Sequence, residues 1–104
     1  MTPLKEAFLI KVPKVEPKDA KQEIVLPHYE FYTILVEDYD MALAEGQKII
    51  KEKGIHGVIL CAGFDNIEFG DLSRAFGPQV GVFVASGDSR SDNIVSNAIA
   101  EAGW

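Results

Sequence analysis

The segment at residues 57–66 constrains the fold of this chain more than any other part of the sequence. It begins with an unbroken apolar run over residues 57–62 and then changes abruptly to polar residues at Asp65 and Asn66. A strand that is apolar on both faces is typical of the centre of a parallel sheet, which is covered above and below. Open α/β sheets bind their ligands beyond the carboxyl ends of such strands. The residues after this strand are therefore where we expect a ligand site.

Strand and helix patterns alternate along most of the chain, which predicts parallel strands joined by right-handed crossover helices. We therefore expect one α/β domain over residues 1–104. It has a mostly parallel four-stranded sheet with helices on both faces, as in flavodoxin-like or Rossmann-like folds. The predicted strands are residues 7–12, 31–36, 57–62 and 80–85, and the predicted helices are residues 39–53, 68–76 and 92–102.

Residues 13–29 fit a helix, an edge strand or a loop. If residues 23–26 pair antiparallel with the strand that follows them, a ferredoxin-like α+β sheet is the alternative fold.

Two of the predicted helices have clear apolar stripes. In the helix at 39–53, Asp38 is a candidate N-cap and Gly54 a candidate C-cap. Gly46 lies inside this helix, where glycine costs ~0.5–1 kcal/mol relative to alanine, so we expect it at a close packing contact. The expected buried stripes are Tyr39, Leu43, Gly46 and Ile50 in this helix, and Ile94, Val95, Ala98, Ile99 and Ala102 in the last one.

Composition excludes several classes of function. The net charge of −6 over 104 residues argues against binding to nucleic acid or to anionic lipid, both of which need a clustered basic face. No apolar run approaches the ~20 residues that span a bilayer, and the N-terminus does not resemble a signal peptide. Cys61 is the single cysteine, so neither an intramolecular disulfide nor a multi-cysteine metal site is expected. These features favour a cytoplasmic protein with no evident cofactor.

Three segments resemble a small family of single-domain prokaryotic proteins whose function is uncharacterised. They are VEDYDMA at residues 36–42, GIHGVILCAGF at residues 54–64 and VGVFV at residues 80–84, and the resemblance covers residues 5–85. Ala62 stands where the family pattern has a second glycine. The resemblance implies an α/β fold and assigns no catalytic residue.

Acidic side chains follow two strands of the predicted sheet. If the strands at 57–62 and 80–85 are neighbours, Asp65 and Asp88 emerge at one edge, with Asp92 one helical turn later. Three carboxylates in that place are weak candidates for Mg²⁺ or Ca²⁺ ligands, although no metal site is expected. The simpler interpretation is that each aspartate caps the helix that follows it.

Cys61 is a candidate nucleophile at the end of its predicted strand. A cysteine nucleophile needs a base, and the chain has only His28 and His56. His56 precedes the strand and lies ~15 Å from Cys61 at ~3.3 Å per residue, so the alternative is an inert cysteine in the core.

The glycines after the two strands predict turns in which backbone amides meet a small ligand. No Gly-x-Gly-x-x-Gly or P-loop is present, so a nucleotide has no direct support. The candidate ligand-binding residues are Cys61, Gly63, Asp65, Asn66, Gly87, Asp88, Ser89 and Arg90.

Two functions from different classes remain open. One is a self-associating domain that binds a small molecule or acts as an accessory protein, with its ligand edge at the carboxyl ends of the third and fourth predicted strands. Trp104, at the end of the chain, is a candidate anchor in a second subunit of a homo-oligomer. The other is a small enzyme that uses Asp65 or Asp88 as acid/base or metal ligand, with Cys61 as nucleophile.

Overall fold

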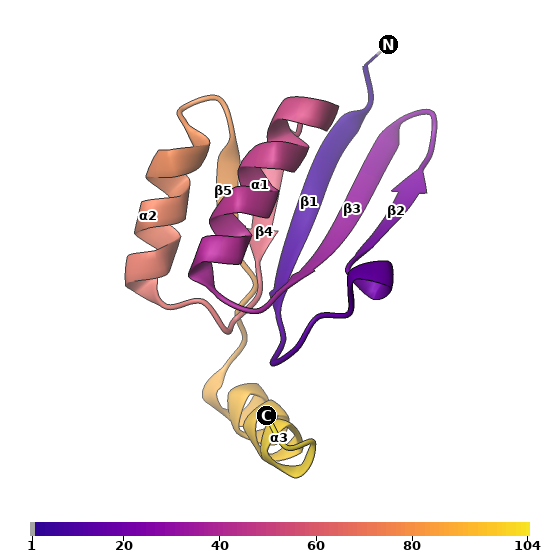
Figure 1. Ribbon diagram of the computed structural model, residues 1–104. Coiled ribbons are helices and arrows are strands. Elements are labelled where there is room, and N and C mark those ends of the chain that lie inside the picture. The colour runs from indigo at the N-terminus through magenta and orange to yellow at the C-terminus, as the bar shows by residue number, and fades with distance from the viewer. Residues whose placement is uncertain (1) are drawn as a thin grey trace.

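A five-stranded sheet lies at the centre of the computed structural model, which describes residues 2–104 (Figure 1). The strand order is β2-β3-β1-β4-β5, so the first strand of the chain occupies the middle. Its pairs with β3 and β4 are parallel, as is the β4–β5 pair. The strands are β1 (Leu4–Lys11), β2 (Lys21–Val25), β3 (Tyr29–Val36), β4 (Gly57–Leu60) and β5 (Gly81–Val84).

The prediction of four strands is wrong by one, because β2 adds an antiparallel edge next to β3. The segment that the sequence left open thus contains a short 3₁₀ helix, η1 (Pro17–Asp19), followed by this strand. All five residues of β2 are exposed, and polar side chains in an edge strand give little apolar signal. The antiparallel pair does not produce the ferredoxin-like alternative, since the other three pairs are parallel.

Two helices, α1 (Tyr39–Lys53) and α2 (Asn66–Phe76), lie side by side on one face of the sheet (Figure 1). The carboxylate of Asp38 caps α1 by accepting the backbone N–H of Met41 at 2.8 Å. Gly54 ends α1 with φ of 71°, a left-handed conformation that favours glycine. Both predicted caps are confirmed.

The core lies between the sheet and these two helices. Every second residue of the strands points into it, including Leu9 in β1, Ile34 in β3 and Leu60 in β4, each at most 1% exposed. The stripe of α1 is centred on Ala42, Gly46 and Ile49, with the predicted Tyr39, Leu43 and Ile50 partly buried beside it. Leu72 and Phe76 of α2 are buried in the same core.

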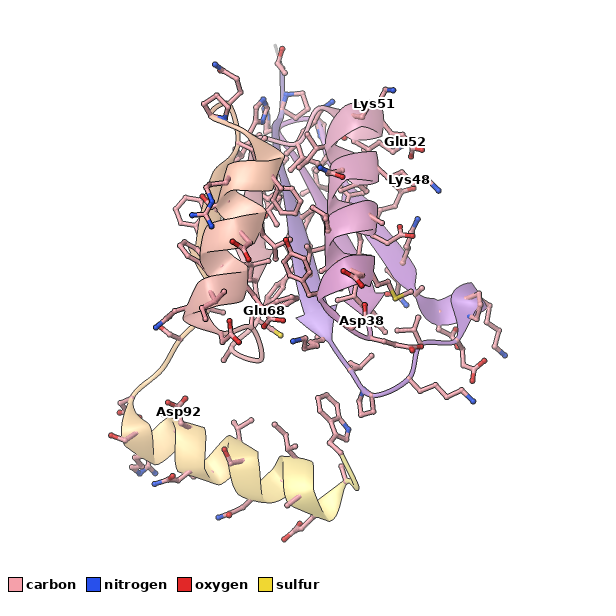
Figure 2. The ribbon with its side chains drawn as sticks, turned by 60° about the vertical axis from the view of Figure 1, so that its left-hand side comes forward. Asp38, Lys48, Lys51, Glu52, Glu68 and Asp92 are labelled. Atoms are coloured by element: carbon pink, nitrogen blue, oxygen red, sulfur yellow. The ribbon has the colours of Figure 1, made fainter. Side chains whose placement is uncertain are left out.

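The third helix, α3 (Ser89–Glu101), does not cover the second face of the sheet, contrary to the sequence prediction. It lies beyond the carboxyl ends of the strands, away from α1 and α2 (Figures 1 and 2), and packs extensively against no other helix or strand of the described residues 2–104. Its predicted stripe stays largely exposed, with Ile94 at 54% and Val95 at 56%. Within residues 2–104 no helix combines the length and apolar character needed to cross a membrane.

Because α3 lies elsewhere, the sheet face opposite α1 and α2 is uncovered, and we call it the open face. Its residues alternate along the strands with those of the core. It is formed by Ile24 of β2, Tyr29, Phe31 and Leu35 of β3, Phe8 and Ile10 of β1, Ile59 of β4 and Phe83 of β5.

Candidate ligand site at the carboxyl edge of the sheet

A cavity of about 560 Å³ lies between the carboxyl edge of the sheet and α3. Ligand pockets in proteins measure ~300–1,000 Å³ and are lined mainly by apolar side chains. Most lining residues here are apolar. They come from the end of β1 and the chain after it, from the chain after β4, and from α3 and the residue that ends the chain. The lining residues are Ile10, Lys11, Val12, Pro13, Glu37, Cys61, Ala62, Gly63, Val95, Ile99 and Trp104.

Backbone hydrogen bonds beyond the strand ends hold the sheet side of the cavity in place. The N–H of Val12 donates to the carbonyl of Val36 at 2.9 Å, and the N–H of Cys61 donates to the carbonyl of Leu9 at 3.1 Å. Both bonds extend the sheet pairing past the last residue of a strand. A Cβ on Gly63 would lie 3.4 Å from the Cys61 sulfur, so these two residues are close neighbours in this wall.

The opposite side of the cavity is the apolar face of α3. Val95 and Ile99 lie one helical turn apart on this face, and Trp104 follows the end of the helix. The N–H of Trp104 donates to the carbonyl of Ile99 at 3.2 Å, which turns the end of the chain back toward the helix. Trp104 is 56% exposed, so the indole borders the cavity and also reaches solvent.

The two charged side chains at the cavity already have partners. The ammonium of Lys11 lies 3.1 Å from a carboxylate oxygen of Glu68 and 4.9 Å from the centre of the Phe64 ring. Figure 2 shows Glu68 at the end of α2 nearest α3. Glu37 accepts the backbone N–H of Val15 at 2.8 Å. Because these charges are neutralised or hydrogen-bonded by the protein itself, the cavity fits an uncharged, largely apolar ligand.

Cys61 lies in the cavity wall but far from both histidines. Its sulfur accepts the backbone N–H of Lys11 at 3.3 Å. At the other end of β1, Nδ1 of His56 accepts the N–H of Lys5 at 3.0 Å, and the carbonyl of His28 accepts the N–H of Leu4. The length of β1 separates the two ends by ~20 Å at ~3.3 Å per residue, so no histidine is placed to take a proton from Cys61.

Asp65 and Asp88 both cap helices. The carboxylate of Asp65 accepts the N–H of Glu68 at 2.8 Å, and the Glu68 side chain accepts the N–H of Asp65, which completes a capping box for α2. The N–H of Ser91 donates to Asp88 at 2.8 Å and lowers the pKa of Asp88 below its ordinary 3.8. Across residues 2–104, no three His, Cys, Asp or Glu side chains are grouped in a way that could hold a metal ion.

Of the eight candidate ligand-binding residues, the cavity brings together Cys61 and Gly63. The others lie outside its lining: Asp65 and Asn66 at the start of α2, and Gly87, Asp88, Ser89 and Arg90 at the start of α3. Sequence reasoning missed the apolar part of the lining. A signal was available for part of it, since Val95, Ile99 and Trp104 belong to an amphipathic C-terminal segment.

A second, smaller hollow of about 240 Å³ lies between β2, β3 and α1. Charged side chains surround its mouth, among them Lys21, Glu23, Glu52 and Lys53. The Nζ of Lys53 lies 5.8 Å from the centre of the Tyr32 ring, and the Tyr32 hydroxyl donates to Glu30. This hollow is smaller than most ligand pockets. The cavity under α3 is therefore the better candidate site.

Comparison with known protein families matches residues 4–99 to the family described as "Family of unknown function (DUF6506)". This chain belongs to that family. The DUF6506 match includes all five strands, α1, α2 and most of α3, and it includes every residue of the cavity lining except Trp104. The resemblance to an uncharacterised family is thereby confirmed. No curated protein and no solved structure matches the chain.

Proposed function

We propose that this DUF6506 protein is a cytoplasmic, self-associating domain that binds a small, uncharged and largely apolar molecule between the carboxyl edge of its sheet and α3. The observation that carries the proposal is the cavity of about 560 Å³ at that edge. Its position agrees with the general rule for ligands in open α/β sheets. The free thiol of Cys61 supports the cytoplasmic location, because free cysteines persist in reducing compartments.

The residue contacts favour binding over catalysis. Asp65 and Asp88, the two candidate acid/base groups, have carboxylates that accept hydrogen bonds from helix amides. Cys61 has the backbone N–H of Lys11 as its polar neighbour, and both histidines lie at the other end of β1. The remaining lining is carbon-rich, which contributes ligand affinity by burying apolar surface.

Trp104 supplies a direct readout, because it is the only tryptophan in the chain and borders the cavity. We expect a neutral, apolar naphthylamine dye to bind saturably, with one dye per chain, and to quench Trp104 fluorescence by energy transfer. Filling the cavity with Ala62→Leu should weaken this binding at least about tenfold, or ~1.4 kcal/mol.

The matched control is Ala100→Leu, which adds the same atoms at an exposed position of α3 outside the cavity lining. It should leave dye affinity unchanged. Equal affinity for the Ala62→Leu variant and the unmodified protein, or dye uptake without saturation, would refute the ligand site.

A further inference from the structure

The open face is a second apolar surface, which shares Ile10 with the lining of the cavity, and most of it meets solvent. Ile24 and Phe83, at its two edges, are 58% and 57% exposed. The large apolar residues between them, including Phe8, Phe31 and Ile59, are half-buried by one another and lie outside the core under α1 and α2. Parallel strands normally have both faces covered, so this face is incomplete in a single chain.

On the β5 side of the open face, two glycines pair beneath an aromatic ring. Gly57 of β4 and Gly81 of β5 are register partners. A Cβ on Gly81 would lie 3.1 Å from the Phe83 ring, and a Cβ on Gly57 would lie 3.7 Å from it. The Phe83 ring therefore lies across both glycines. On the other side of the face, the rings of Tyr29 and Phe31 stack at 6.2 Å.

The open face is also nearly free of charge. Among the described strand residues on this side, Glu6 is the one with a charged side chain, and it accepts the Tyr29 hydroxyl at 2.8 Å. A surface without like charges can pack against an identical copy of itself, as a two-fold dimer requires. A partner recognised by charge, such as nucleic acid or a lipid headgroup, would find no complementary group here.

The size of the open face is sufficient for a dimer. Five strands at ~4.8 Å spacing, with about five residues each at ~3.3 Å, give a face of roughly 400 Å² in projection. A pair buries this area on both copies, roughly 800 Å² in projection, and the corrugation of the side chains raises the total toward ~1,000 Å², the lower limit for a specific interface. An apolar patch of this size is often functional.

We infer that the occupant of the open face is the open face of a second copy of this chain, so that two sheets stack across a two-fold axis. The alternative occupant within the chain, α3, lies at the carboxyl edge with Val95 and Ile99 lining the cavity. The dimer specifies the self-association included in the proposed function and rests on it. Among the open-face residues, Ile10 is the one that also lines the ligand site.

Light scattering and sedimentation velocity of the full chain test the inference. The chain should be a dimer, and Phe83→Glu should weaken it ~100-fold or more, so that the variant is a monomer where the unmodified chain is dimeric. Ile24→Lys, at the opposite edge of the face, should act in the same way. Both positions are more than half exposed, so neither variant should unfold the protein, and circular dichroism checks this. The control is Ile67→Lys on α2, which is 75% exposed and distant from the open face, and it should remain a dimer.

A further variant distinguishes two possible occupants of the open face, which are the open face of a second copy and α3 of a second copy. Ile94→Lys changes the exposed stripe of α3 outside the cavity lining and should leave the dimer intact. Loss of the dimer in this variant would overturn sheet stacking and assign the face to α3 of a second copy. Mixing the Ile94→Lys and Phe83→Glu variants would then restore dimers. In the mixed pair, the unmodified α3 of the Phe83→Glu chain can still pack on the unmodified open face of the Ile94→Lys chain.

A chain that is monomeric at every concentration would also overturn the inference, as would dimers that survive both open-face substitutions. Failure of the dimer and failure of the ligand site are distinguishable. The Phe83→Glu variant should keep its dye affinity, whereas Ala62→Leu should lose it and remain a dimer.

Discussion

Replacing Gly46 by alanine should destabilise the protein, although alanine is the better helix former. A Cβ at this position would lie 2.7 Å from Cε1 of Phe76 and closer still to Cζ. Real Cβ atoms do not approach so near, and Phe76 is only 7% exposed, so its ring has little room to move. Alanine gains ~1 kcal/mol of helix propensity, whereas overpacking a core costs ~1–3 kcal/mol. We expect a net loss of about 1 kcal/mol in the free energy of unfolding.

Urea unfolding followed by circular dichroism measures this difference, and Gly70→Ala is the matched control. Gly70 also lies inside a helix, α2, but a Cβ there would meet only the Arg74 guanidinium at 3.5 Å. Gly70→Ala should therefore stabilise the protein by about 0.5–1 kcal/mol. In a Phe76→Leu background, the cost of Gly46→Ala should largely disappear. If Gly46→Ala stabilises the protein as much as Gly70→Ala does, the close contact between α1 and α2 is refuted.

Two further predictions concern pH. The hydrogen bond to Glu30, followed by burial and by the nearby carboxylate charges, raises the pKa of Tyr32 from 10.0 to about 12. The neutral phenol of Tyr32 is thus favoured in the folded state. The stabilisation that its hydrogen bond to Glu30 contributes is complete below pH 10 and is lost as pH rises through about 12. Burial and the hydrogen bond to Glu6 also raise the pKa of Tyr29, so a variant must assign the Tyr32 step. In an absorbance titration of tyrosinate, Glu30→Gln should shift a late step back toward the ordinary pKa, and an unchanged curve would contradict this assignment. The pKa of Asp88 shifts in the opposite direction, because the N–H of Ser91 lowers it below 3.8. The ionised carboxylate is thus favoured in the folded state. Its contribution to stability as the cap of α3 is complete above pH 3.8 and is lost as pH falls through the lowered pKa. Circular dichroism should show helix lost in that acid range, and the Asp88→Asn variant should lack this step.

Much of the fold could be predicted because its elements carry local signals. The run at 57–62 and the alternation of strands and helices predicted β4 and its neighbours. Caps such as Asp38 and Gly54 depend on short-range hydrogen bonds, which the residue types reveal directly. The β2 strand was harder to predict, because five exposed residues at an edge have no apolar periodicity.

The position of α3 could not be predicted for a different reason. Its stripe of Ile94, Val95 and Ile99 shows that one side of the helix is apolar, but periodicity carries no information about which surface that side meets. The four-residue link between β5 and α3 allows the helix to leave the sheet. Because α3 lies beyond the carboxyl edge, one face of the sheet stays uncovered and a cavity is left between that edge and the helix.

The sequence predicted a site at the carboxyl ends of β4 and β5, whereas the cavity lies at the carboxyl ends of β1 and β4 and contains no residue of the link between β5 and α3. Cys61 and Gly63 line the cavity because they directly follow β4, as expected for an open α/β sheet. Asp65 and Asp88 were candidate site residues because they are polar residues that follow strands, but their carboxylates accept hydrogen bonds from helix amides. The apolar lining, with Val12 and Trp104, depends on tertiary placement that no local pattern contains.

The central position of β1 has a consequence for how the chain acquires its fold during synthesis. Its first partner strand begins at Tyr29, but its second partner arrives much later, since Glu6 pairs with Gly57 in the second half of the chain. One side of β1 therefore keeps unsatisfied amide and carbonyl groups during synthesis until β4, which begins at Gly57, has also been made. Contacts between such distant segments slow folding, and unpaired strand edges promote aggregation. We expect the nascent chain to be most prone to aggregation before β4 emerges.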